Sequence, residues 1–162
     1  MEWSLWLDEY LLAAVAHRHV VMTIPRRLRA HFLYDRRRLG QLSRVASRTL
    51  HAYVRAALGE PVAVPGVVSL AQSFGSIGQW HPQLHLVVTA GAFRRDGRFA
   101  THFAHYVAVL AEAWRRAVPA VFVREGWLEE EAAAAIGVCT GGVRPQRFTA
   151  HGRGRLTEPG RA

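Results

Sequence analysis

The densest polar group in the sequence stands where an apolar strand is expected to begin. It comprises residues 72–76 (QSFGS) and 80–85 (WHPQLH). Because alternate residues of a strand share a face, Gln83 and His85 are expected to point to the same side. Imidazole suits Mn²⁺ and Zn²⁺, and an amide oxygen suits harder ions such as Mg²⁺ or Mn²⁺. We therefore expect a Mg²⁺ or Mn²⁺ site in which Gln72, from the strand paired through a short turn, is the third ligand.

Other interpretations of the histidines stay open at this point. His81 and His85 could be ordinary half-buried histidines with hydrogen-bond partners, and His81 could also join the metal site if the strand begins early. His17 and His19 share one face at the start of the first expected strand, where both could be structural.

A second feature of the sequence is its positive charge. All 21 basic residues are arginine, and with 12 acids they give a formal net charge of +9. Such a balance favours polyanions, most often nucleic acid. Four arginines lie at helical spacing on one stripe, and three more precede them: Arg37, Arg44, Arg48 and Arg55, after Arg26, Arg27 and Arg29. The stripe could follow a phosphate backbone without base recognition, or it could be a solvated helix face.

Length and composition restrict the class of protein. With 162 residues, half of them apolar, the chain can form one domain with a substantial core, which excludes a disordered or fibrous protein. The single cysteine, Cys139, excludes an internal disulfide and a zinc–cysteine cluster. The longest apolar stretch, residues 132–139, is far shorter than the roughly 20 residues of a membrane span. The sequence therefore predicts a soluble, cytoplasmic protein without membrane contact.

The periodicity of apolar residues predicts the order of the elements. Helices are expected over residues 3–15, 26–58 with a break near Asp35, 103–118 with an end at Pro119, and 126–136; strands are expected over 20–24, 67–74, 84–93 and 99–101. Asp35 is a candidate cap and Gly59 a stop signal. This order indicates an α+β fold with helices packed on a largely antiparallel sheet, of the ferredoxin or RNA-recognition type. A domain over residues 1–136 and a disordered arginine- and glycine-rich tail over 137–162 are expected.

Four blocks of the sequence carry a likeness to a known family. They are residues 6–12, 17–29, 72–76, and 81–91 with Phe93. Over roughly residues 6–130 the chain resembles the rolling-circle transposases of the insertion sequence ninety-one type, within the HUH endonucleases. The resemblance implies nicking of single-stranded DNA by a tyrosine nucleophile, with a phosphotyrosine link. It also implies a divalent ion, held by a histidine-hydrophobe-histidine motif, that polarises the scissile phosphate.

Carried over to this chain, the resemblance gives site residues and two departures. His85 matches the second histidine of the motif, Gln83 replaces the first, and Gln72 matches a glutamine of the family. In the family the nucleophilic tyrosine lies downstream of the motif. None of the four tyrosines of this chain matches it, namely Tyr10, Tyr34, Tyr53 and Tyr106. The resemblance therefore implies a truncated transposase that is inactive alone, and a natural truncation or a frameshift near residue 137 would account for it. The alternatives are a basic nucleic-acid-binding module without catalysis, or a poorly folded product; the oligomeric state stays open.

Overall fold

The computed structural model describes residues 11–75, 78–101, 107–137 and 143–146. Its elements, in chain order, are β1 (His17–Thr23), η2 (Arg26–Leu28), α2 (Arg29–Tyr34), α3 (Arg37–Leu58), β2 (Val67–Phe74), β3 (Trp80–Thr89), β4 (Gly91–Phe93), β5 (Phe99–Thr101), α4 (Val107–Arg124), α5 (Glu130–Gly137) and β6 (Val143–Gln146).

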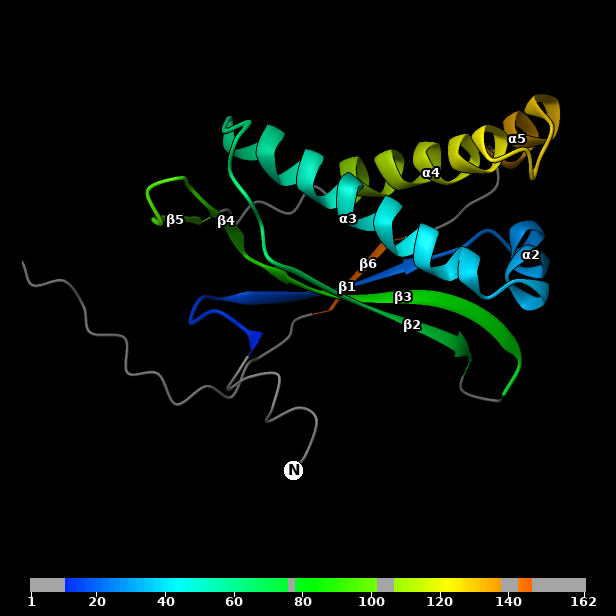
Figure 1. Ribbon diagram of the computed structural model, residues 1–162, viewed down its shortest axis with the longest axis horizontal. Coiled ribbons are helices and arrows are strands. Elements are labelled where there is room, and N and C mark those ends of the chain that lie inside the picture. Colours follow the sequence, from blue (N-terminus) through cyan, green and yellow to red (C-terminus); the bar gives the residue numbers. More distant parts are fainter. Residues whose placement is uncertain (1–10, 76–77, 102–106, 138–142, 147–162) are drawn as a thin grey trace, which may run out of the picture.

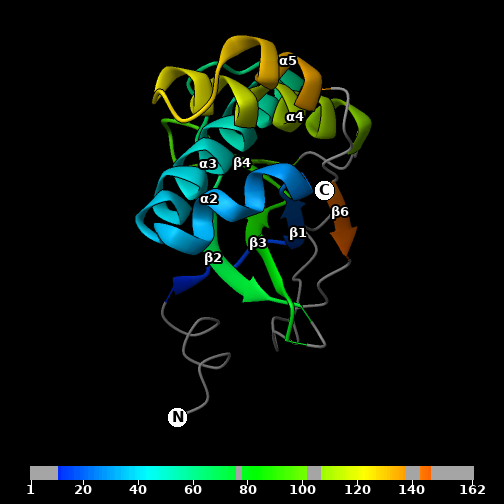
Figure 2. The ribbon, with the colours of Figure 1, turned by 90° about the vertical axis from the view of Figure 1, so that its right-hand side faces the viewer.

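The described elements form two layers, a sheet and a layer of helices. The main sheet has the strand order β2-β3-β1-β6 with antiparallel pairing throughout, and β4 and β5 form a separate hairpin. Helices α3 and α4 lie side by side over one face of this sheet, as Figure 1 and the turned view in Figure 2 both show. The α+β fold with helices packed on an antiparallel sheet is therefore confirmed.

The core lies between the sheet and the helices, and strand alternation determines which residues enter it. Met22 of β1 and Leu84 and Leu86 of β3 are fully buried on the face towards the helices. They pack in one cluster with Leu42 of α3 and Trp114 of α4. Because neighbours in a strand alternate, the residues between them belong to the face turned away from α3 and α4, called the outer face below.

Two tryptophans fix the helices to the sheet through hydrogen bonds as well as by packing. The indole Nε1 of Trp114, on α4, donates to the carbonyl oxygen of Thr23 at 2.9 Å. The indole Nε1 of Trp80, on β3, donates to the carbonyl oxygen of Arg29 at 2.8 Å. A buried indole N–H requires such a partner, so these bonds set the positions of α4 over β1 and of α2 against β3.

The predicted helix break and helix end are confirmed. The carboxylate of Asp35 accepts a hydrogen bond from the backbone N–H of Arg37, the first residue of α3, at 3.0 Å. This bond satisfies one of the free donors at the helix start. At the other end Gly59 has a φ of 67°, a left-handed conformation that glycine adopts without a steric cost.

The strand expected from residue 84 begins earlier, at Trp80, although Pro82 lies within it. Gln72 of β2 pairs with Gln83, whereas Phe74 pairs with Trp80, so Ser73 alone stands opposite both His81 and Pro82. This is a β-bulge, where proline is tolerated because the ladder is interrupted and its missing N–H is not needed.

The bounds of two further helices differ from the expected ones. Helix α4 continues through Pro119 to Arg124, because the buried Val121 and Phe122 hold the following turn against the core despite the hydrogen bond that proline cannot make. Helix α5 begins at Glu130, four residues later than expected. The expected helix over 3–15 falls mostly outside the described residues, and residues 12–16 are not helical. Within the expected disordered tail the structure describes β6, paired with β1.

Candidate metal and nucleic-acid site

The three residues predicted to form a metal site lie together on the outer face of the sheet. In the register of β2 and β3, Gln72 stands directly opposite Gln83, and His85 follows two residues along the same strand. Gln83 and His85 are half-buried and Gln72 is exposed. The hairpin between β2 and β3 thus places the three residues at neighbouring positions on one face of the sheet.

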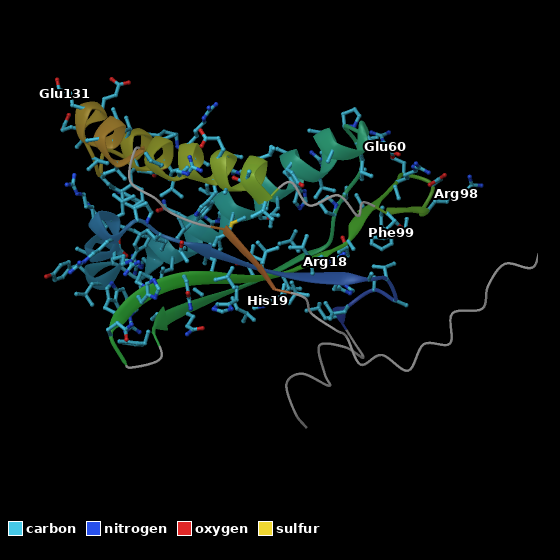
Figure 3. The ribbon with its side chains drawn as sticks, turned by 180° about the vertical axis from the view of Figure 1, so that it is seen from behind. Arg18, His19, Glu60, Arg98, Phe99 and Glu131 are labelled. Carbon is cyan, nitrogen blue, oxygen red and sulfur yellow. The ribbon has the colours of Figure 1, made fainter. Side chains whose placement is uncertain are left out.

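His19, for which the sequence indicated only a structural role, joins this group. In the register of β1 and β3, His85 pairs with Val21 and His19 pairs with Val87, so the two histidines are diagonal neighbours. Nε2 of His19 lies 3.0 Å from Nδ1 of His85, with ring centroids 5.1 Å apart and an angle of 22° between the ring planes. Figure 3 shows His19 on the side of β1 turned away from the helices.

The second ring nitrogen of His85 has an unusual environment. Its Nε2 is buried and makes no hydrogen bond in the structure. Burial first, and the neighbouring His19 second, lower the pKa of His85. Both effects favour the neutral ring, which is the state in which an imidazole can bind a cation. An unpartnered buried nitrogen on a neutral ring fits a cation ligand, although it does not identify the cation.

The amides add weaker oxygen ligands. The side-chain nitrogen of Gln72 donates to the carbonyl oxygen of Phe74 at 2.8 Å, so the amide oxygen of Gln72 is the atom left for a cation. In the described part of the chain, no three His, Cys, Asp or Glu side chains come together as a metal-binding group. A cation at this place would therefore depend on imidazole nitrogen and neutral amide oxygen, without a carboxylate.

His81 is not placed with this group by the strand geometry. It lies in the bulge, so the alternation that aligns Gln83 with His85 does not extend to it. Burial lowers the pKa of His81, and the positive charge of Arg29 lowers it further. His81 is therefore affected by the charge at the start of α2, and it is not grouped with the pair formed by His19 and His85.

The arginines predicted to bind DNA separate into two groups. Arg26 and Arg27 are exposed in η2, just after the end of β1, where Thr23 pairs with Gln83. Arg29 follows in α2, and its Nε donates to the carbonyl oxygen of Ile24 at 3.2 Å. This first group therefore adjoins the end of the sheet that carries the two glutamines.

The second group is the stripe on α3. At about 100° per residue, Arg37, Arg44 and Arg48 point roughly opposite the buried row that contains Leu39 and Leu50. These three arginines are exposed. Because the buried row faces the sheet, the stripe and the outer face lie on opposite sides of the molecule.

The fourth member of the stripe has a structural partner. Nε of Arg55 donates to the carbonyl oxygen of Ala63 at 2.7 Å, which ties the end of α3 to the loop before β2. Arg55 is half-buried, in contrast to the other three. Its guanidinium is therefore at least partly engaged in holding the fold.

Two of the four tyrosines lie in the described residues, and both belong to the helical layer. Tyr34 ends α2 and is 87% exposed. Tyr53 of α3 packs against the core. Tyr10 and Tyr106 lie outside the described residues.

Comparison with known proteins supports one functional class. Residues 66–137 match a protein-family model described as "Putative transposase". The match supports a transposase. It spans β2 to α5 and so includes Gln72, Gln83 and His85, whereas His19 and the arginines from Arg26 to Arg55 precede it. Since transposases act on DNA, the match implies an interaction with DNA.

The other comparisons add no relative. No curated protein and no solved structure matches the chain. Within the described residues, none of the helices combines the length and the apolar character that crossing a membrane requires.

Proposed function

We propose that this chain is part of a rolling-circle transposase of the HUH type, and that its outer face binds single-stranded DNA together with a divalent cation. The observation that carries the proposal is the meeting of Gln72, Gln83 and His85 on one face, within the segment that matches a transposase family. The imidazole lies at the motif position that the sequence resemblance assigns to a metal ligand.

The chemistry of this site is charge stabilisation at a phosphate. A divalent cation on His85 would act as a Lewis acid on a phosphate oxygen and would position the strand. The ligands are neutral, so a DNA phosphate would supply the negative charge that the protein site lacks. Arg26 and Arg27, at the adjoining end of the sheet, would hold neighbouring phosphates.

Strand cleavage is not part of the proposal for this chain alone. In the resemblance the nucleophile is a tyrosine downstream of the metal motif, and none of the tyrosines of this sequence matches it. We therefore propose binding of metal and single-stranded DNA without nicking.

A second candidate function has an observation of its own. The exposed stripe of Arg37, Arg44 and Arg48 lies on the side of the molecule opposite the outer face. This placement favours a basic module that binds nucleic acid along α3 without a metal ion. The two functions differ in whether the removal of His85 changes metal-dependent binding.

Calorimetry with Mn²⁺ tests the proposed function. The titration is carried out on the wild type and on His85→Ala, with and without a single-stranded oligonucleotide. His51→Ala is the matched control, because His51 is also half-buried but lies on α3. We expect Mn²⁺ binding that is lost in His85→Ala and kept in His51→Ala. An absence of Mn²⁺ binding in the wild type, even with DNA present, would refute the metal site and leave the basic module.

A further inference from the structure

The contact between His19 and His85 is a hydrogen bond between two ring nitrogens 3.0 Å apart. Such a bond needs a single N–H, because one nitrogen has to donate and the other to accept. The structure therefore allows two arrangements of protons, and they leave Nε2 of His85 in different states.

In the first arrangement His19 donates from Nε2. Nδ1 of His85 then accepts, and the proton of the neutral His85 ring is on Nε2. That N–H is buried and has no acceptor in the structure. A buried donor without an acceptor is unfavourable, and cation binding cannot relieve it, because the nitrogen carries a proton in place of a lone pair.

In the second arrangement His85 donates from Nδ1 to Nε2 of His19. Nε2 of His85 then carries a lone pair, which is the form of the ring that binds a cation. Histidines that bind metals commonly donate their other ring N–H to an acceptor, which fixes the tautomer and the ring orientation. The buried, unpartnered Nε2 is thus accounted for if a cation is its natural partner.

We propose that His19 is a positioning residue for the cation site. It accepts the Nδ1–H of His85 and holds His85 in the tautomer that presents Nε2 to a divalent cation. This inference rests on the proposed function, since it describes the same site. It assigns to β1, which lies outside the segment that matches the transposase family, a part in a site whose other residues lie on β2 and β3.

The chemical class of the cation follows from the ligand that is presented. An oriented imidazole nitrogen is preferred by first-row transition ions such as Mn²⁺, Co²⁺ and Zn²⁺, whereas Mg²⁺ prefers oxygen. The site should therefore take Mn²⁺ more strongly than Mg²⁺.

The tautomer can be measured without any metal ion. Long-range ¹H–¹⁵N correlation spectra of the wild-type protein at pH 7.5 report which ring nitrogen of His85 carries the proton. We expect the proton on Nδ1 in the wild type. In His19→Ala we expect it to move mainly to Nε2, which free imidazole side chains favour. A proton on Nε2 in the wild type would overturn the proposal, whatever the outcome of the metal titrations.

Metal titrations then separate positioning from direct coordination. Loss of the hydrogen-bond partner of a ligating histidine typically weakens metal binding by about 10–100-fold, so we expect that loss of Mn²⁺ affinity in His19→Ala. His19→Gln keeps an acceptor for the Nδ1–H of His85 in its amide oxygen, and we expect it to recover most of the affinity. His51→Ala is the control on α3, and a thermal melt by circular dichroism checks that each variant is folded.

Two results would contradict the positioning role. If His19→Gln binds Mn²⁺ as weakly as His19→Ala, while both are folded, His19 does not act through an acceptor atom and direct coordination replaces the proposal. If both variants bind as tightly as the wild type, His19 has no part in the site. Failure of the wild type to bind any of the ions would refute the proposed function itself, and the tautomer measurement would still decide the contact between His19 and His85.

Discussion

The two groups of arginines give a sharp test of where DNA lies on the molecule. If single-stranded DNA binds at the metal site, the phosphates contact Arg26 and Arg27, which follow β1 at the end that carries Gln83. Arg44 and Arg48 of α3 point away from the sheet and should not contact this DNA. We compare Arg26→Ala/Arg27→Ala with Arg44→Ala/Arg48→Ala, two variants that each remove two exposed charges.

The salt dependence of binding gives the expected magnitude. For a single strand, the logarithm of the affinity falls with the logarithm of the salt concentration by about 0.7 for each phosphate contacted. Loss of two contacts should therefore reduce the slope by about 1.4. Between 50 and 200 mM salt, a fourfold change, the variant at Arg26 and Arg27 should lose about 7-fold less affinity than the wild type.

Fluorescence anisotropy with a labelled oligonucleotide, at several salt concentrations and with Mn²⁺ present, measures both slopes. We expect the reduced slope in the variant at Arg26 and Arg27 and a slope like that of the wild type in the variant at Arg44 and Arg48. The reverse pattern would refute the reasoning, because it would place the DNA on α3 and would favour the basic module without a metal ion.

Two further predictions concern stability. Gly91→Ala should destabilise the β4–β5 hairpin, because a β-carbon at this position would overlap the carbonyl oxygen of Ala100. Gly40→Ala in α3 meets no atom and should add about 0.5–1 kcal/mol of helix stability. Urea denaturation compares the two variants, and equal effects on the free energy of unfolding would contradict the close approach at Gly91. Burial, and secondly the neighbouring His19, lower the pKa of His85 in the folded state. Near the ordinary histidine pKa of about 6.5, the unfolded chain therefore binds more protons than the folded chain does. The stability from this group is therefore fully present above that pH and is lost as the pH falls through the lowered folded-state pKa. Between pH 7.5 and 5.0, the free energy of unfolding measured by denaturation should fall less in His85→Gln than in the wild type. An equal fall would contradict the lowered pKa of His85.

The parts of the site that the sequence predicted depend on local geometry. Gln72 and Gln83 belong to strands joined by a short turn, so once both strands are recognised their pairing follows, and alternation adds His85. The stripe on α3 follows in the same way from the 3.6-residue repeat. In each case the relevant residues lie on one element or on two consecutive ones.

The parts that sequence reasoning missed depend on packing between distant segments. His19 and His85 are 66 residues apart, and their contact requires β1 to pair with β3 in one register; a shift by one residue would put them on opposite faces. The continuation of α4 through Pro119 likewise depends on the burial of Phe122 in a core that periodicity alone does not describe. The spacing of His17 and His19 was the signal for a shared face, but it did not give the neighbouring strand.

The charges around the candidate site bear on how metal and DNA binding depend on each other. The groups that could hold the cation are neutral, since they are two amides and the imidazole of His85, and the adjoining groups Arg26 and Arg27 are positive. A divalent cation alone would meet repulsion from the arginines without a compensating carboxylate, whereas a phosphate between them would be attracted to both. Each ligand should therefore strengthen the binding of the other, and thermodynamic linkage requires the two factors to be equal. The calorimetric titrations with and without oligonucleotide measure this factor for Mn²⁺, and anisotropy with and without Mn²⁺ measures it for DNA. A factor of about one in both measurements would mean that the two ligands bind independently and do not share one site.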